Sequence, residues 1–279
     1  MLRFADNSKR KTKYDLLDEY KDCLDGTARF ESFNRLSCDE PEAARSEAVA
    51  YSFFKRNGYP IQVEETPNEG GVDFRIQAES TDFVVEVTSI LKKTYTEHSG
   101  MPEIISDRVG SVSLYKVPHL IRSKVSSKAR QMSGMSEYDC PRILMIACEH
   151  PEYAYFLDDK EPFGPAGLLT SPPKISIPNG NNVTCLKDSL FFRFENDRIV
   201  FCRKSISAVL LFYISKYRAQ ATGLLHPNPV HNFSIELLPS VPFVEALISG
   251  IDATEGHTNT RWIPDNLPAG FFVYNDAAR

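Results

Sequence analysis

Two neighbouring stretches set the expected fold: GGVDFRI at residues 70–76 and TDFVVEVTSI at residues 81–90. Both are short, rich in β-branched and aromatic residues and bounded by turn residues, which predicts two strands. Each carries one carboxylate among apolar neighbours, Asp73 in the first and Glu86 in the second. A buried carboxylate needs a partner, and two of them on adjacent strands suit a shared divalent metal ion.

The stretch that carries Glu86 is expected to be a central strand. Because successive side chains alternate, Val84 and Thr88 share the face of Glu86, while Val85 and Val87 lie on the opposite face. Apolar residues on both faces are typical of a strand that is covered on both sides. Glu86 is therefore hard to explain as a solvated surface residue.

A helix is predicted upstream, over residues 41–58, with Pro41 suited to its first turn and Asn57-Gly58 to its C-terminal stop. Glu47 lies in the middle of the apolar stripe of this helix, beside alanine and aromatic residues. Two interpretations stay open. Glu47 contributes to the chemistry of a site, or it reaches solvent or pairs with a buried base.

A basic segment follows the two strands. Residues 108–132 hold six bases and no acid, although the whole chain has a net charge of −5. Residues 117–132 have helical periodicity, and Lys124, Lys128 and Gln131 form one stripe beside the apolar face. A solvated basic face is the common meaning of such a run. The absence of balancing acids favours a surface that faces an anion.

The remaining segments are read from their turn residues and apolar runs. Loops or irregular structure are expected over 92–110, 151–189 and the end of the chain, helices over 14–20 and 241–249, and strands over 61–63, 142–148, 189–195, 199–203, 206–214 and 233–237. The bases at 9–13 fit an exposed tail better than a nucleic-acid contact. His226 and His231 fit a Pro-rich turn better than a site.

The composition, 42% hydrophobic and 25% charged in 279 residues, is that of an ordinary globular protein. No apolar run is long enough for a membrane span and the N-terminus lacks the apolar core of a signal peptide, so a cytoplasmic location is expected. The six cysteines are scattered, which favours reduced thiols. The motifs of nucleotide hydrolases, dinucleotide-dependent enzymes and lipases do not occur in the sequence.

The order of a helical Glu47, Asp73 beside one strand, Glu86 on the next and a basic helix resembles the PD-(D/E)XK nuclease superfamily, whose fold is restriction-endonuclease-like. The resemblance covers about residues 41–150. It implies an α/β fold with a mixed central β-sheet flanked by helices, an irregular insertion and a β-rich C-terminal part. Residues 1–40 would form a helical, basic arm, and 41–279 a single nuclease-like domain with its core at 41–150 and 190–250.

The chain departs from the family pattern at one position. The family has a lysine two residues after the strand acid, and this chain has Thr88, which is also simply a good strand residue. In some branches of the family the lysine projects into the site from a neighbouring element. The resemblance therefore implies that Lys128 or Lys124 replaces it, or else that the protein is a degenerate, inactive member.

The resemblance also implies a role for each site residue. Mg²⁺ or Mn²⁺ would be held by Asp73, Glu86 and the backbone carbonyl of Val87, since hard cations prefer oxygen ligands. Lys128 or Lys124 would orient the attacking water and neutralise phosphate charge. Gln131 would hydrogen-bond water or phosphate, and Glu47 would hold water near the ion. The expected nucleic-acid contacts are Arg122, Lys124, Lys128 and Arg130.

The leading hypothesis is a Mg²⁺-dependent phosphodiesterase, a DNA endonuclease of the kind that serves restriction, defence or repair. RNA as substrate and a homodimer or partner protein stay open, and no membrane is expected. The alternative is an inactive nuclease-fold protein that binds nucleic acid or serves in assembly. A third hypothesis, a small-molecule enzyme on an unrelated α/β fold, requires a different order of helices and strands.

Overall fold

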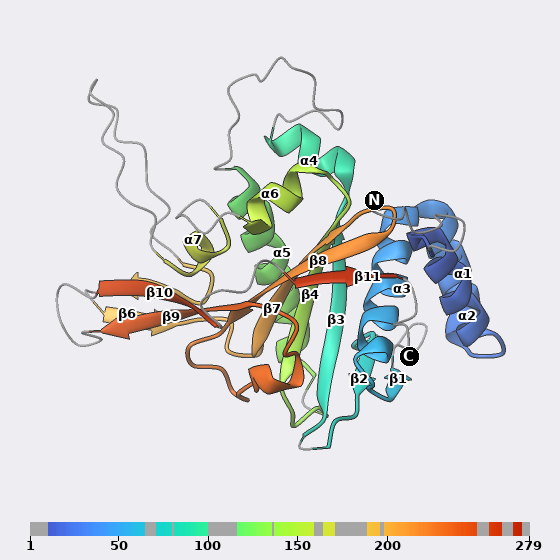
Figure 1. Ribbon diagram of the computed structural model, residues 1–279. Coiled ribbons are helices and arrows are strands. Elements are labelled where there is room, and N and C mark those ends of the chain that lie inside the picture. The colour runs from blue at the N-terminus through green and yellow to red at the C-terminus, as the bar shows by residue number, and fades with distance from the viewer. Residues whose placement is uncertain are drawn as a thin grey trace, which may run out of the picture.

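The computed structural model has three layers, with one large sheet between two groups of helices (Figure 1). It describes residues 11–64, 71–79, 81–99, 116–135, 137–158, 164–170, 189–195, 198–249, 257–263 and 270–274. The protein is therefore mixed α/β with a large central sheet flanked by helices, and that part of the expected fold is confirmed.

The sheet has nine strands in the described part of the chain. Along its main path the strands are β1 (Ile61–Val63), β2 (Phe74–Ile76), β3 (Phe83–Ile90), β4 (Arg142–Cys148), β7 (Ala208–Ile214), β8 (Arg218–Leu225), β9 (Phe243–Ser249) and β10 (His257–Ile263). The pairs β3–β4, β4–β7 and β8–β9 are parallel and the other pairs on this path are antiparallel. β11 (Gly270–Val273) also pairs with β8. A separate hairpin joins β5 (Phe192–Glu195) and β6 (Arg198–Phe201).

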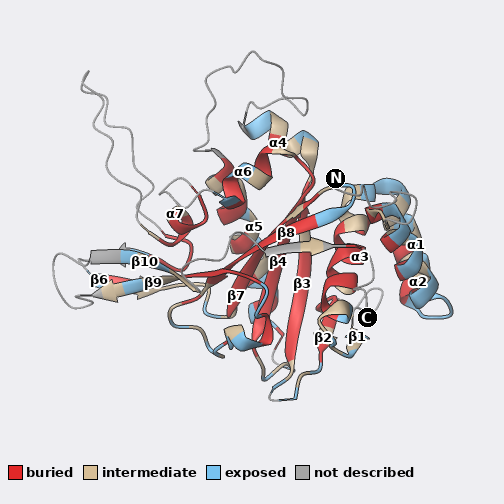
Figure 2. Ribbon diagram, in the orientation of Figure 1, coloured by how far each residue is buried: buried red, intermediate tan, exposed pale blue. Residues whose placement is uncertain are grey.

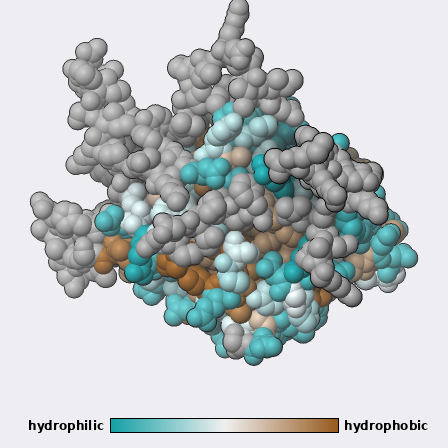
Figure 3. Space-filling model, viewed as in Figure 1, coloured by the Kyte–Doolittle hydropathy of each residue, from teal (hydrophilic) through white to brown (hydrophobic). Residues whose placement is uncertain are grey.

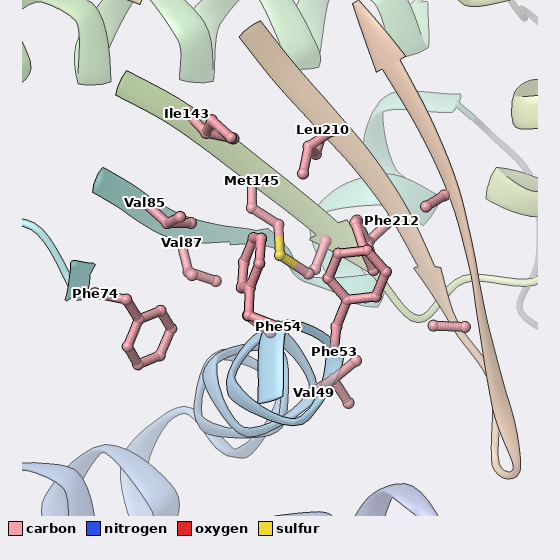
Figure 4. Close-up of a cluster of buried hydrophobic side chains, with 14 of the residues drawn as sticks. Val49, Phe53, Phe54, Phe74, Val85, Val87, Ile143, Met145, Leu210 and Phe212 are labelled. Carbon is pink, nitrogen blue, oxygen red and sulfur yellow. The ribbon is translucent and has the colours of Figure 1, made fainter. Parts of the chain in front are cut away.

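Three helices cover one face of the sheet: α1 (Lys13–Leu24), α2 (Arg29–Asp39) and α3 (Pro41–Arg56). Phe53 and Phe54 of α3 point at the sheet, where Phe54 faces Val87 of β3 and Phe53 packs against Phe212 of β7 (Figure 4). Segment 1–40, which the sequence sets apart as an arm, thus supplies α1 and α2 to the same core. Their outer sides are exposed and hydrophilic (Figures 2 and 3).

Four helices pack on the opposite face: α4 (Lys92–Ser99), α5 (Lys116–Ser133), α6 (Glu152–Asp158) and α7 (Ala166–Leu169). α5 lies in the connection between the parallel strands β3 and β4, as such a crossover requires. Its apolar stripe, which includes Ile121, Val125 and Met132, is buried against Val84 and Leu144 of the sheet. The helix predicted over 117–132 is confirmed.

The predicted elements around the two opening stretches are confirmed: the strands at 61–63, 72–76, 83–90 and 142–148 and the helix at 41–58. Strand β3 is buried on both faces, as the alternation of its side chains predicts. Strand β7 agrees with the apolar run at 206–214, and β5 and β6 lie within or beside the predicted strands at 189–203.

Several other expectations are wrong. The segment predicted as a helix, 241–249, is strand β9, because FVEALIS fits both periods and its pairing with β10 decides between them. The strand expected at 233–237 is a coil that ends in a 3₁₀ turn, Ile235–Leu237. Helix α4 stands in the loop expected over 92–110, of which 100–110 lie outside the described residues. Helices α6 and α7 stand in the irregular segment 151–189, and its residues 159–163 and 171–188 lie outside the described part.

The junction of β8 and β9 depends on Gly223. A Cβ at this position would lie 2.2 Å from two ring carbons of Phe243, its partner across the two strands. Phe243 is buried in the core, so its ring has no free space to enter. Gly223→Ala is therefore expected to lower the free energy of unfolding by about 1–3 kcal/mol, as overpacking does. Urea unfolding measures this loss.

Gly134→Ala is the matched control, because its nearest neighbour would be the carbonyl oxygen of Gln131 at an ordinary 3.5 Å. Equal stability of the two variants would contradict the close packing of β8 on β9.

The turn after β8 holds a buried neutral histidine. The backbone N–H of Asn228 donates to Nδ1 of His226 at 3.0 Å, and Nε2 lies 2.9 Å from the carbonyl oxygen of Cys202. Since a carbonyl only accepts, the proton is on Nε2. Burial lowers the pKa of His226 to about 4, the Cys202 carbonyl opposes this shift, and the nearby Lys204 and Arg203 add to it.

This lowered pKa predicts a loss of stability in acid. In the unfolded chain His226 takes up a proton near pH 6.5, whereas in the folded chain it does so near pH 4. Its stabilising contribution is therefore complete above pH 6.5 and declines by about 3 kcal/mol as the pH falls to 4. His226→Gln should remove this part of the pH dependence of the unfolding free energy. An unchanged slope in the variant would contradict the assignment.

Candidate functional site

Asp73 and Glu86 lie next to each other at a notch in the sheet. The last residue pair between β2 and β3 is Phe74↔Val85, so the same register carried one step further places Asp73 opposite Glu86. In the described part of the chain β2 ends there, while β3 continues to Ile90 beside β4. Both carboxylates are buried, with 7% of Asp73 and 4% of Glu86 exposed.

The backbone of β3 holds the Asp73 side chain in place. The N–H of Val87 donates to Asp73 Oδ2 at 2.6 Å. In a strand the N–H and C=O of one residue point to the same side, so the Val87 carbonyl also points toward the notch. The Asp73 carboxylate and the Val87 carbonyl therefore lie on the β2 side of β3, while the Glu86 carboxylate stands on the face that α5 covers.

Glu47 reaches the same region from α3, on the other side of the sheet from α5. It is 7% exposed, as its place in the apolar stripe predicts. Its carboxylate accepts a hydrogen bond from Arg29 Nη2 at 3.0 Å, and the same nitrogen lies 3.7 Å from Asp73 Oδ1. Arg29 thus links Glu47 with Asp73. The structure therefore shows the second interpretation of Glu47, pairing with a buried base, and a role in the chemistry of a site stays a prediction.

The negative charges of Glu47 and Asp73 act on the phenol of Tyr20 in α1. Burial raises the pKa of its phenol, and the charges of Glu47 and Asp73 raise it further, while Arg29 opposes them. The notch is therefore a region of negative potential, which Arg29 reduces.

Lys128 approaches Glu86 from the opposite layer. Its ammonium lies 2.5 Å from Glu86 Oε1 and donates to Gln131 Oε1 at 3.1 Å. The Lys128 side chain is 25% exposed and that of Glu86 is 6% exposed. The structure thus brings Lys128, rather than Lys124, to the strand acid, on the β3 face where the sequence has Thr88.

Lys124 lies one helical turn before Lys128 and is half-buried. Burial lowers the pKa of its ammonium, the positive charge of Lys128 lowers it further, and Glu40 opposes both. No carboxylate in the described part of the chain comes within ion-pair distance of Lys124. It therefore belongs to the surroundings of the site without touching its carboxylates.

Two of the expected nucleic-acid contacts lie elsewhere on α5. Arg122 is 9% exposed and donates to the carbonyl oxygen of Gly167 on α7, so its guanidinium packs against α7 rather than standing on an open surface. Arg130 is exposed, but at 100° per residue it lies on the other edge of α5 from Lys128.

Sequence reasoning missed Arg29. Its signal is that it precedes the buried Phe33 by four residues and so lies on the inward stripe of α2. A basic residue in an apolar stripe needs a buried acidic partner. Glu47, in the apolar stripe of α3, is that partner.

The notch offers oxygen atoms, the type of ligand that a hard divalent cation prefers. Among the described residues, no group of three or more His, Cys, Asp or Glu side chains is placed to hold a metal ion. Mg²⁺ is commonly bound by only one or two carboxylates, with water and substrate phosphate completing its shell. Asp73, Glu86 and the Val87 carbonyl supply ligand atoms of this type, and Lys128 and Arg29 are the cations that lie beside the two carboxylates in the structure.

The chain has no match in any of three comparisons, with protein-family models, with curated proteins or with solved structures. Within the described residues, no helix combines the length and the apolar character that a membrane crossing requires.

Proposed function

We propose that this protein is a Mg²⁺-dependent phosphodiesterase with a restriction-endonuclease-like fold. Its proposed substrate is nucleic acid, with DNA preferred, and it would cleave DNA as an endonuclease. One observation carries the proposal: Lys128 lies 2.5 Å from Glu86. The PD-(D/E)XK pattern requires two acids and a lysine, and the lysine missing at Thr88 is supplied by α5. Asp73, which β3 holds through the Val87 N–H, is the second acid.

The chain's own residues explain how the site would work. Without a metal, Lys128 and Arg29 neutralise carboxylates that would otherwise repel one another by about 4 kcal/mol at 4 Å and an effective dielectric of 20. Asp73, Glu86 and the Val87 carbonyl would hold Mg²⁺, which polarises the scissile phosphate and lowers the pKa of the attacking water.

Lys128 would act at the edge of that site. It would orient the attacking water and stabilise negative charge on the phosphate in the transition state. Gln131 accepts a hydrogen bond from the Lys128 ammonium and so limits where it points. Glu47 would align water on the α3 side, where Arg29 holds its carboxylate.

A second function, binding nucleic acid without cleaving it, is favoured by the position of Arg29. This guanidinium lies between Glu47 and Asp73, and Lys128 pairs with Glu86, so each carboxylate has a cation partner without a metal. In that case the cluster is a buried salt-bridge network, and α5 remains as the basic surface.

Nicking of supercoiled plasmid separates the two functions. The protein is expected to nick the plasmid with Mg²⁺ or Mn²⁺ and to lose this activity in excess chelator. Asp73→Asn should remove the activity while plasmid binding persists, and it also controls for a contaminating nuclease. A labelled RNA assayed in parallel distinguishes the substrates. If no metal supports cleavage of either nucleic acid while binding is retained, the non-catalytic function is correct.

A further inference from the structure

A basic hollow lies on the opposite flank of α5 from the carboxylates. Its volume is about 830 Å³, and it lies between α5, the hairpin β5–β6 and the turn that leads into β7. Five bases line it and no Asp or Glu does: Arg130, Arg142, Arg193, Arg203 and Lys204. We name this site the basic hollow.

Most of this positive charge is not neutralised by the protein. Arg193 pairs with Glu195 at 2.7 Å. For Arg130, Arg142, Arg203 and Lys204, the described part of the chain offers no carboxylate within ion-pair distance. Four like charges around one concavity raise its potential, and an anion that enters relieves their repulsion.

Arg142 is a buried cation in the wall of the hollow. It is 8% exposed, and its terminal nitrogens donate to the carbonyl oxygens of Met132, Met135 and Tyr138. Its Nε is buried and has no hydrogen-bond partner in the described part of the protein. A buried positive charge is unfavourable unless a negative charge lies near it, so an anion in the hollow would stabilise Arg142.

Arg203 is held in a sparsely populated backbone conformation. Its φ is 59°, in the left-handed region that favours glycine. Its Nε and Nη2 donate to Ser126 Oγ at 3.1 and 2.8 Å, and its Nη1 donates to the carbonyl oxygen of Leu190 at 2.5 Å. These bonds fix the guanidinium at the wall of the hollow. Ser126, which accepts them, keeps its own hydroxyl proton for a ligand.

The buried His226, beside the hollow, is also affected by this positive charge. The charges of Lys204 and Arg203 add to the burial that lowers the pKa of His226. The lining holds serine hydroxyls, which are donors for oxyanions, and its one ring is the imidazole of His231.

We propose that the basic hollow binds a phosphate-bearing anion, separately from the carboxylate notch. Arginine forks, a lysine and serine hydroxyls are the groups that recognise phosphate oxygens. The phosphate can belong to a nucleic-acid backbone or to a phosphorylated small molecule, since both present the same oxygens. The site does not depend on the proposed nuclease activity, because its residues lie on the other flank of α5 from Lys128.

Calorimetric titration tests the proposal, with tripolyphosphate and a short thymidine oligonucleotide as probes and Asp73→Asn as the protein, so that cleavage cannot interfere. The double variant Arg130→Gln/Lys204→Gln removes two exposed cations from the hollow. It should bind tripolyphosphate at least about tenfold more weakly, because each charged hydrogen bond is worth a factor of this order.

Lys216→Gln is the matched control, an exposed lysine just beyond the far end of β7. Oligonucleotide that displaces tripolyphosphate would support the site and assign it to a nucleic-acid backbone. Tripolyphosphate binding that oligonucleotide leaves unchanged would support it and assign it to a small phosphorylated ligand. The proposal is overturned if tripolyphosphate does not bind, or if the double variant binds it as tightly as Lys216→Gln does. A protein that binds tripolyphosphate in the hollow yet nicks no plasmid would refute the nuclease function alone.

Discussion

Replacing Lys128 by alanine is expected to lower the cleavage rate by a factor of about 10² to 10³, the loss that follows removal of one preorganised donor from a reacting oxyanion. The Lys128 ammonium is held between Glu86 Oε1 and Gln131 Oε1, so α5 delivers it to a defined position. Alanine leaves a buried Glu86 without this cation and the phosphate without its charge donor. The initial rate of plasmid nicking with saturating Mn²⁺ measures the effect.

Lys124→Ala is the matched control, one turn away on the same helix and likewise partly buried. It should change the rate by less than about tenfold, because Lys124 has no carboxylate of the site as a partner and its contribution is a screened one. If Lys124→Ala is the inactive variant and Lys128→Ala is active, the assignment of the replacement lysine is reversed. If neither matters, the site does not use a lysine and the resemblance to the nuclease pattern fails.

Replacing Arg29 by methionine is expected to lower the free energy of unfolding in chelator by about 3–5 kcal/mol, the cost of leaving a buried charge without its partner. Arg29 and Glu47 have side chains that are only 10% exposed, and Asp73 lies within ion-pair distance of the same guanidinium nitrogen. Methionine keeps the apolar stem but removes the charge. Urea unfolding in chelator measures the loss.

The same variant reports on the metal. With Arg29 absent, Mg²⁺ is the cation left to neutralise Asp73, so added Mg²⁺ should stabilise Arg29→Met more than it stabilises the unmodified protein. Arg35→Met, an exposed position on the same helix, is the control and should be nearly neutral. A large loss of stability that Mg²⁺ does not reverse would identify a salt-bridge network without a metal and favour the non-catalytic function.

The fold around the two opening stretches follows from local pattern, and the rest depends on tertiary contacts. Strands β3 and β4 and helices α3 and α5 have long apolar runs or clear stripes. Strand β8, with the sequence RAQATGLL, was missed because small residues dominate it, and Gly223 is small only to admit Phe243. In β9, the sequence FVEALIS is equally compatible with a helix, and only pairing with β10 selects the strand.

The site was predictable to the extent that its residues have local signatures. Asp73, Glu86 and Glu47 are acids in apolar contexts, and the structure buries all three. The choice of Lys128 over Lys124 depends on how α5 is rotated and shifted against β3, which sequence spacing does not define. Arg29 was not predicted because its partners lie on other elements, and the contact of Arg122 with α7 was not predictable because the sequence did not reveal that helix.

The crossover between β3 and β4 also determines when Glu86 gains its cation partner during synthesis of the chain. Lys128 follows Glu86 by 42 residues, so at about 5–20 residues per second a nascent chain has the strand acid for several seconds before its lysine exists. During that interval β3 also lacks its parallel neighbour β4. In the folded protein α5 both packs on this face of β3 and brings the cation to Glu86. A truncated or stalled chain that ends before this helix would expose an apolar strand with an unneutralised charge. Such a chain is expected to aggregate.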